Sequence, residues 1–487
     1  MKKAIGVAAM AVFLLITGCS TPCSVPEAEK RPIKKNGIIS SKKQGAKMGD
    51  IMIVKLKPED GPVKNTAILQ KYLDAGGTVR LEQPGTYDIT GPLIIGSETS
   101  LEFGPGVIVR RSAEGHRNGP LIVNRGTFSG EWDHHIRIEG LRLVTGGVDL
   151  THFSIYPGLR GHLAFLRVRD LIIRDYECLD LTKLGYGIHI CNFENILLER
   201  LHIEGDKDGV HLSNGRYFTI RDSRFGTYDD AIALNAYDYC LSTATYGWVE
   251  DGLIENCHDL DKGKPAGFFC RMLGGAWTDW HKGMEVQNST LAVHQGHLYS
   301  VCLPLPPQPR KTPLISTVPP THKSGIAEAG GIPWRYVMPH DGRYEGSCRR
   351  ITFRNIYLHK PRTGFGLTLE GGLWSNSVPK GLTMPVIQDL VLDGIHAECE
   401  LRYVFTAAHP AQNIRVVNST LRGTVILAPV FQNHKAEEYP VMDILFSGVN
   451  FPQPPGKFCS KTDGRRLQFQ FIGCSGEGWK IPEEAGK

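Results

Sequence analysis

Two short acidic motifs lie near the middle of the chain, one 22-residue interval apart. The first contains Asp208, and the second contains the adjacent pair Asp229 and Asp230. Carboxyl groups that converge in one site can divide acid and base work, because crowding raises the pKa of one while another stays ionised. Such a set can protonate a leaving oxygen and activate a water, which is the chemistry of glycosidic-bond hydrolysis.

The same interval returns in a repeat of short apolar segments. Residues 187–190 (GIHI), 209–212 (GVHL) and 231–234 (AIAL) each begin with a small residue and continue with apolar residues at every second position. This alternation indicates a short, half-buried strand. A second set of apolar segments recurs at similar spacing, at 171–173, 196–198, 217–220, 253–254, 351–353, 390–392, 414–416 and 444–446.

Short strands repeating every 20–30 residues indicate a solenoid. The ladder of a leucine-rich repeat is absent and helical repeats are longer, so the pattern predicts an all-β fold, a single-stranded right-handed parallel β-helix. Successive coils share one core and stack about 4.8 Å apart. A residue 22 positions further on therefore lies above its predecessor. This places Asp208 against Asp230 on one outer face, with Asp229 beside them.

A short amphipathic helix is predicted before the first coil, over Asn65–Leu73 with Asn65 as its N-cap. Gly76 and Gly77 would end it, and strands are predicted over 78–81 and 92–95. A helix at this position would cap the open end of the solenoid, which otherwise exposes core and strand edges.

The first residues are typical of an export signal. Two lysines precede an apolar run to Ile16, which is followed by Thr17-Gly18-Cys19. Ile16-Thr17-Gly18-Cys19 resembles a bacterial lipobox, which predicts a signal peptide over 1–18 and a lipid on Cys19. The alternative is an ordinary signal peptide with a chance cysteine. We expect an exported lipoprotein on the outer membrane, the cell surface or in the periplasm of a bacterium, anchored to the membrane by its lipid.

Residues 19–50 are predicted to be a flexible tether, and residues 51–487 the β-helix domain. The whole chain has a formal charge of +5. The signal carries +2 and the tether +4, so the domain is left with about −1. A domain without basic excess does not predict nucleic acid as a partner. The 12 cysteines show no zinc spacing. Cys178/Cys191 and Cys459/Cys474 are candidate disulfides, with buried free thiols as the alternative.

The segments around the acidic motifs resemble the polygalacturonase family, glycoside hydrolase family 28. Residues 207–210 (KDGV) and 229–234 (DDAIAL) are similar to its N-T-D-G and D-D-C-I-A motifs, at the same spacing. The opening of the domain, at 65–73, 85–87 and 101–103, also resembles the start of pectin-degrading β-helix enzymes. The resemblance implies an inverting hydrolase in which Asp229 is the general acid, while Asp208 and Asp230 share the general-base role.

The chain departs from the family pattern at several positions. Lys207 replaces the threonine before the first aspartate, and the G-H-G motif is missing where 237–246 forms an insertion. The R-I-K motif has only a partial counterpart, in which Arg271 retains the arginine. Because these basic residues hold the galacturonate carboxylate in the family, a neutral or sulfated sugar is as much expected here as a uronate.

Further residues are candidates for binding a saccharide. They are Lys207, His211, Asn235, Asp238 and Arg271, and four tryptophans in predicted loops could stack on sugar rings: Trp277, Trp280, Trp334 and Trp374. The aspartates could instead be turn formers or hold Ca²⁺, although no cofactor is required by the sequence. The Pro-rich segment 303–345 is predicted to be a long loop that walls one end of the groove, which favours an exo mode.

Three functions remain open from the sequence. The first is a glycoside hydrolase acting on a polysaccharide or oligosaccharide as a monomer. The second is a polysaccharide lyase on the same fold, for which Lys207, His211 and Arg271 could supply the base. The third is a glycan-binding or adhesion protein without catalysis, against which the three aspartates argue.

Overall fold

The computed structural model describes residues 51–114, 119–149, 156, 158–304, 312–432, 434–452 and 458–476. The chain divides into two units, 1–44 and 45–487, and every element below belongs to the second. The predicted signal peptide, Cys19 and most of the tether lie outside the described residues. Within them, no helix has both the length and the apolar character to span a bilayer.

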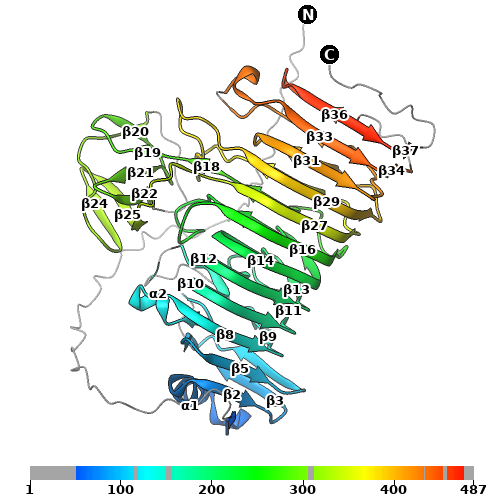
Figure 1. The fold of residues 1–487 in the computed structure, drawn as a ribbon. Coiled ribbons are helices and arrows are strands. Elements are labelled where there is room, and N and C mark those ends of the chain that lie inside the picture. The colour runs from blue at the N-terminus through cyan, green and yellow to red at the C-terminus, as the bar shows by residue number, and fades with distance from the viewer. Residues whose placement is uncertain are drawn as a thin grey trace, which may run out of the picture. The chain divides into compact units, whose positions relative to one another are not determined.

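The strands form three parallel stacks that the chain visits in turn, coil after coil (Figure 1). The first stack holds β4 (Leu93–Ile95), β7 (Ile122–Asn124), the first parts of β10 (Gly161–Arg174), β12 (Tyr186–Glu199) and β14 (Val210–Thr227), then β15 (Ile232–Asn235), β17 (Phe268–Leu273), β28 (Thr363–Thr368), β30 (Tyr403–Ala407), β32 (Ile426–Leu427) and β35 (Cys459–Ser460).

The second stack runs through the middle of the long strands. It holds β1 (Ile51–Ile53), β2 (Gly77–Leu81), β5 (Thr99–Phe103), β8 (Asp133–Glu139), parts of β10, β12 and β14, then β16 (Val249–Asp259), β27 (Cys348–Leu358), β29 (Ile387–Ala397), β31 (Ala411–Val417), β33 (Met442–Ser447) and β36 (Leu467–Ile472).

The third stack closes each coil. It holds β3 (Gly85–Ile89), β6 (Val107–Arg111), β9 (Arg142–Val144), β11 (Glu177–Leu181), β13 (His202–Gly205) and the ends of β14, β16, β27 and β29. The short strands β34 (Asn450–Phe451) and β37 (Ser475–Gly476) pair beside it. All three stacks are parallel, so the predicted parallel β-helix is confirmed.

One apolar core fills the interior of the coils. Inward residues such as Ile188, Val210 and Ile232 stack in register and are fully buried. Gly209 begins one repeat because a Cβ there would lie 2.7 Å from the carbonyl oxygen of Ala231. This close approach explains why each repeat starts with a small residue. Burial of a continuous apolar face between coils is the main source of stability in a solenoid.

The strands are longer than the sequence predicts. The segments 187–190 and 196–198 belong to the single strand β12, which bends at Asn192 and Asn195, where φ is 53° and 56°. Asparagine adopts this left-handed conformation more readily than most residues. Two short predicted strands therefore become one strand with two bends.

The capping helix is present but begins earlier than predicted. Helix α1 spans Pro62–Ala75 with Gly61 at its N-cap and Gly76 at its C-cap. Asn65 is therefore not the N-cap. It lies fully buried inside the helix. Proline at the first helical position is pre-organised for a helix and lacks the N–H that would be unpaired there, which explains the earlier start.

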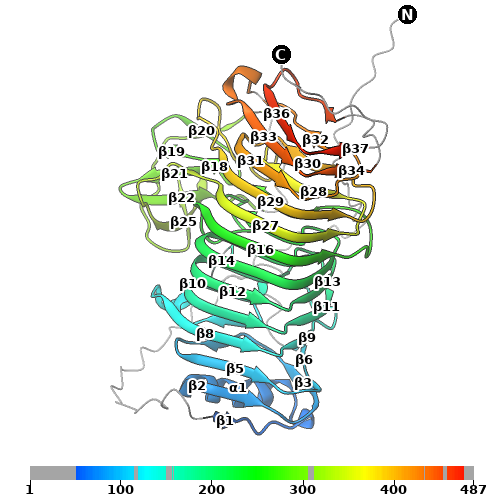
Figure 2. The ribbon, with the colours of Figure 1, turned by 45° about the vertical axis from the view of Figure 1, so that its right-hand side comes forward.

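Insertions interrupt the repeat between the first and second stacks. Paired residues on β16 and β27 are 99 positions apart, because the insertion at 274–347 carries a separate sheet, in which β19 and β21 pair in parallel and the other pairs are antiparallel. Its strands are β19 (Thr278–Asp279), β21 (Leu291–His294), β22 (His297–Val301), β25 (Ile332–Pro339) and β24 (Ile326–Ala329). Figures 1 and 2 show this sheet beside the coils that contain β14 to β27. Two shorter insertions lie at 236–248, before the long insertion in the chain, and at 369–386, after it.

The remaining elements are small. They are the two-stranded pairs β18 (Gly275–Ala276) with β26 (Glu345–Gly346) and β20 (Met284–Val286) with β23 (Leu314–Ser316), helix α2 (Gly126–Ser129) and the 3₁₀ turns η1 (Pro58–Asp60) and η2 (Ala436–Glu438). The Pro-rich segment predicted as a long loop is therefore largely part of the inserted sheets. Cys178, Cys191, Cys459 and Cys474 are free thiols, so neither candidate disulfide forms.

Candidate active site

The two acidic motifs occupy consecutive turns from the third stack to the first. The backbone N–H of Gly209 donates to the carbonyl of Asp230 at 3.0 Å, and Val210 pairs with Ile232. This stacking brings together Asp208, Asp229 and Asp230, here called the carboxylate cluster. One oxygen from each lies within 4.8 Å of the other two. The expected convergence of the three aspartates is therefore seen in the structure.

The members of the carboxylate cluster differ in exposure. Asp208 and Asp230 are 3% and 2% exposed, whereas the side chain of Asp229 is 36% exposed. A saccharide arriving from solvent would meet Asp229 first. Asp230 is held from below, because the backbone N–H of Phe268 on the next coil donates to its Oδ1 at 2.9 Å.

Lys207 lies between two members of the cluster. Its ammonium donates to Asp229 and is 3.3 Å from Asp208 Oδ1. Burial alone would lower the pKa of Lys207, but the charges of Asp208 and Asp229 outweigh burial and raise it well above its usual value. Lys207 is therefore a permanent cation of the site.

The environment separates the pKa values of Asp208 and Asp230. Burial would raise the pKa of Asp208, but the Lys207 ammonium and the hydrogen bond to His211 hold it below its usual value. Burial, reinforced by the charges of Asp229 and Asp208, raises the pKa of Asp230 well above its usual value. The two buried carboxyls of the cluster therefore differ in how readily each binds a proton, as acid–base chemistry requires.

His211 links the cluster to a second acidic group. Its Nδ1 lies 2.9 Å from Asp208 Oδ2, and its Nε2 lies 3.6 Å from Asp238 Oδ2. Asn235 donates to the same Asp238 oxygen at 2.8 Å. All three side chains are buried, with His211 fully so. They orient Asp208 from behind and are not placed to meet a saccharide first.

Arg271 lies in the same outward row as His211, because the register aligns His211, Ala233 and Arg271. Its guanidinium donates to Glu370 Oε1 at 2.6 Å and to the Thr368 hydroxyl at 3.2 Å. Arg271 holds the pKa of Glu370 below its usual value, although burial opposes this. The candidate substrate clamp is therefore already paired with a carboxylate.

Several residues at the site were not predicted. Tyr186 stacks on His211 with ring centroids 4.2 Å apart, and His189 meets His211 edge-on at 4.9 Å. Tyr186 lies 22 residues before Asp208, and His189 lies 22 residues before His211. The repeat interval in the sequence therefore indicated both positions. Glu370 had no signal, because it lies beyond the long insertion and no motif marks it.

Two aromatic residues from insertions lie at the rim of the site. Tyr239 contacts Trp374 with ring centroids 5.5 Å apart, and Trp374 is 46% exposed. The Tyr239 hydroxyl also accepts a hydrogen bond from Arg160. The other three tryptophans pack within the inserted region, where Trp277 and Trp334 are buried and Trp280 is partly buried. Trp374 alone of the four remains a candidate sugar platform.

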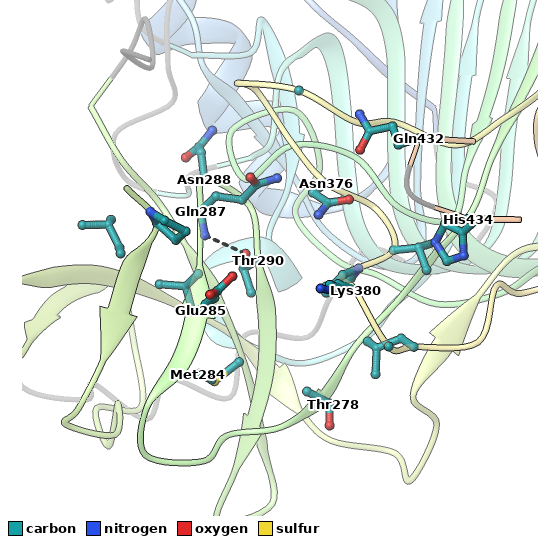
Figure 3. Close-up of a pocket in the computed structure, with 18 of the residues that line it drawn as sticks. Thr278, Met284, Glu285, Gln287, Asn288, Thr290, Asn376, Lys380, Gln432 and His434 are labelled. Atoms are coloured by element: carbon teal, nitrogen blue, oxygen red, sulfur yellow. Dashed lines mark hydrogen bonds between the residues drawn. The ribbon is translucent and has the colours of Figure 1, made fainter. Parts of the chain in front are cut away.

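A large hollow lies close by but does not include the cluster. Its volume is about 1310 Å³, and Figure 3 shows labelled side chains around it from the 274–347 insertion, such as Glu285 and Asn288, from the 369–386 insertion, such as Lys380, and from the segment between β32 and β33. Asn288 also donates to the Trp374 carbonyl at 2.7 Å. Trp374 therefore contacts a residue that lines the hollow through its backbone carbonyl and contacts Tyr239 through its ring.

The three carboxylates could hold a hard cation such as Ca²⁺, which prefers oxygen ligands. However, the Lys207 ammonium already forms ion pairs with both Asp208 and Asp229. A divalent ion would have to displace Lys207, so the charges of the site do not call for one.

No family model matches this sequence, and no curated protein sequence matches it. Among solved structures, the chain is similar to an N-terminal fragment of bacteriophage Phi29 gene product 12 (TM-score 0.44, 10% identity, 85% of this chain and 68% of that one). It is also similar to the Streptococcus pneumoniae surface protein and adhesin PfbA (TM-score 0.42, 12% identity, 88% and 100%). A third is a Yersinia enterocolitica family 28 exopolygalacturonase (TM-score 0.41, 13% identity, 88% and 78%).

These neighbours differ in what their names describe, and the identities and TM-scores are low. The similarity agrees with the β-helix fold, which the strand pairing of this chain establishes independently. It supports no conclusion about function. The choice between hydrolase and binding protein depends on the site.

Proposed function

We propose that the protein is a glycoside hydrolase in which Asp208 is the general base and the pair Asp229–Asp230 supplies the acid. The observation that carries this proposal is the convergence of three carboxyls in one cluster, whose different surroundings lower the pKa of Asp208 and raise the pKa of Asp230. A plain turn former or a simple binding surface has no need of such a split, whereas acid–base catalysis depends on it.

The location of the proton before the reaction decides which carboxyl acts as acid and which as base. Lys207 holds Asp229 in an ion pair, so the resting proton is on Asp230. Asp229 is the exposed member and meets the glycosidic oxygen, so binding of the saccharide has to release it from Lys207. In the reaction, a water attacks the anomeric carbon and gives its proton to Asp208. The acid pair donates a proton to the leaving oxygen as the C–O bond breaks.

The stereochemical course can be tested directly. Inverting enzymes usually separate their two carboxyls by about 6.5–9.5 Å to make room for the water. The nearest oxygens of this cluster lie within 4.8 Å of one another, which is closer to the spacing of about 5–5.5 Å in retaining enzymes. For inversion, the water therefore has to bind at the solvent side of the carboxylates rather than between them. We expect inversion, read by NMR of the first anomer released. Retention would instead indicate that Asp229 acts as a nucleophile.

The site favours an uncharged sugar. Lys207 and Arg271 are the two cationic side chains among the candidate saccharide-binding residues, and both are already paired with carboxylates. Arg160 is engaged as well, with the Leu184 carbonyl and the Tyr239 hydroxyl. Because binding of any saccharide already has to release Asp229 from Lys207, it is Arg271 and Arg160 that disfavour a uronate, whose carboxylate would have to break their contacts.

A polysaccharide lyase is the second candidate, and one contact favours it. The Tyr239 hydroxyl accepts a hydrogen bond from Arg160, so a tyrosine and an arginine, two residue types that can serve in β-elimination, are held together. A lyase also needs a uronate and a cation to neutralise its carboxylate, which the pairing of Lys207 and Arg271 does not provide.

A screen of neutral, sulfated and uronic glycans tests both proposals. New reducing ends without ultraviolet absorbance indicate hydrolysis, whereas an absorbing unsaturated product indicates a lyase. Asp208→Asn and Asp229→Asn should each lower kcat by at least about a hundredfold with an unchanged circular dichroism spectrum. Asp206→Asn is the matched control, because Asp206 is an exposed carboxylate in the same turn. Full activity in both cluster variants would place the catalytic groups outside the cluster, whereas no turnover of any glycan by the unmodified chain would leave only a binding role.

A further inference from the structure

A second group of convergent side chains lies on earlier coils, away from the carboxylate cluster. Glu98 precedes β5, and His134 and His135 lie in β8 on the next coil. Glu98 Oε1 is 3.0 Å from His134 Nδ1 and 2.7 Å from His135 Nδ1, and the two Nδ1 atoms are 3.2 Å apart. Three potential metal-ligand atoms therefore form a compact triangle at the surface.

The backbone explains how two consecutive histidines point to the same place. Successive side chains in a strand normally point to opposite faces. At His135 the backbone takes the left-handed conformation, with φ of 53°, and Glu98 takes it too, with φ of 57°. The bend at His135 turns its imidazole to the side of His134. Because Thr99 pairs with Ile136, Glu98 lies beside His135 on the neighbouring coil.

The size of the triangle fits a small metal ion. In tetrahedral coordination with metal–ligand distances of about 2.0–2.1 Å, neighbouring ligand atoms are roughly 3.3 Å apart. The three sides here, 2.7, 3.0 and 3.2 Å, approach that value. Two imidazole nitrogens with one carboxylate oxygen suit zinc and its neighbours better than calcium or magnesium, which prefer oxygen ligands alone.

A fourth residue supplies the support that metal-binding histidines usually have. Asp170, on the following coil, lies next to His135 in the register, and its Oδ2 is 3.4 Å from His135 Nε2. The other Asp170 oxygen accepts a hydrogen bond from Asn195 at 2.6 Å. A carboxylate on the far nitrogen fixes the tautomer that leaves Nδ1 free to bind a metal.

We propose that Glu98, His134 and His135 bind one Zn²⁺ ion or a chemically similar first-row metal ion, with Asp170 as the positioning carboxylate behind His135. The fourth coordination position faces solvent, since the three side chains are 33–54% exposed. The ion would join two coils near the N-terminal cap, so its effect is on stability.

The test uses the full chain, reduced and stripped of metal by a chelator, and titrates it with Zn²⁺ in a calorimeter. We expect the unmodified chain to bind one equivalent more than His135→Asn or His134→Gln, and its melting temperature to rise only with this extra equivalent. Asparagine is chosen at position 135 because it tolerates the left-handed backbone. Comparing chains that differ at one residue cancels binding to free thiols, which all of them share.

Two further variants sharpen the result. Asp170→Asn should weaken binding by roughly 10–100-fold without changing the stoichiometry, as expected for a group that only positions a ligand. His359→Gln is the matched control, because His359 and His258 also place ring nitrogens 3.3 Å apart but belong to other coils. It should bind Zn²⁺ like the unmodified chain. Equal binding by the unmodified chain and both histidine variants would overturn the proposal and leave Glu98 as a hydrogen-bond acceptor for two imidazoles.

Discussion

At the scale of single residues, Lys207 decides how the candidate site is charged. It replaces a threonine of the family pattern and forms ion pairs with Asp208 and Asp229. The sequence showed the replacement but not its consequence, because the ammonium could have pointed to solvent. With the side chain placed between two carboxylates, Lys207 keeps the proposed base ionised and must be released from the proposed acid.

Replacing Lys207 by methionine should change the pH profile of activity. Loss of the ammonium raises the pKa of Asp208, so the base becomes protonated at a higher pH. The acid limb of kcat/KM should therefore move to higher pH, and activity on that limb should fall roughly tenfold for each pH unit that the limb moves. Lys207→Arg retains the charge and should keep the limb near its original position. An unmoved acid limb in the methionine variant would mean that Asp208 is not the base.

Asp230 links the proposed chemistry to stability. Its pKa is raised in the folded state, so between the unfolded and folded pKa values the folded chain binds more protons than the unfolded chain. Stability is therefore lost as the pH rises through that range. Asp230→Asn removes this cost, and its amide oxygen can still accept from the Phe268 N–H.

We expect Asp230→Asn to be inactive but more stable than the unmodified chain at neutral pH. In urea unfolding, the difference should grow by up to about 1.4 kcal/mol per pH unit above the ordinary pKa of an aspartate. Asp206→Asn, in the same turn, should show no such slope. A variant less stable at every pH would show that Asp230 is ionised in the folded chain.

At the scale of elements, the bends decide how the coils close. The sequence predicted strands at 187–190 and 196–198, but the structure joins them into β12 through left-handed residues. The asparagines were visible in the sequence, yet alternation of apolar residues reports burial and not backbone angle. The same limit led to the misplaced helix cap at Asn65.

The bend at Asn192 provides a test of this closure. Its φ of 53° disfavours β-branched residues, whereas glycine adopts it freely. Asn192→Val should lower the free energy of unfolding by about 1–2 kcal/mol relative to Asn192→Gly. Chemical denaturation of the two variants measures the difference. Equal stability would mean that the bend relaxes without cost.

At the scale of the whole molecule, export and anchoring remain predictions, because residues 1–50 lie outside the described residues. Expression in a Gram-negative host with a clickable fatty acid tests the lipobox. The unmodified chain should be labelled, Cys19→Ser should not, and Cys23→Ser should remain labelled as the matched control. A processed but unlabelled chain would indicate an ordinary signal peptide.

The sequence by itself determined the β-helix and the meeting of Asp208 with Asp230. Both follow from a local regularity, since strand alternation and a constant interval leave one way to stack the coils. The same interval also indicated that Tyr186 and His189 lie beside Asp208 and His211. Only the tertiary structure decided the partners that cross insertions, such as Glu370 on Arg271 and Trp374 against Tyr239. A long insertion breaks the interval, and contacts made across it depend on packing that no local pattern encodes.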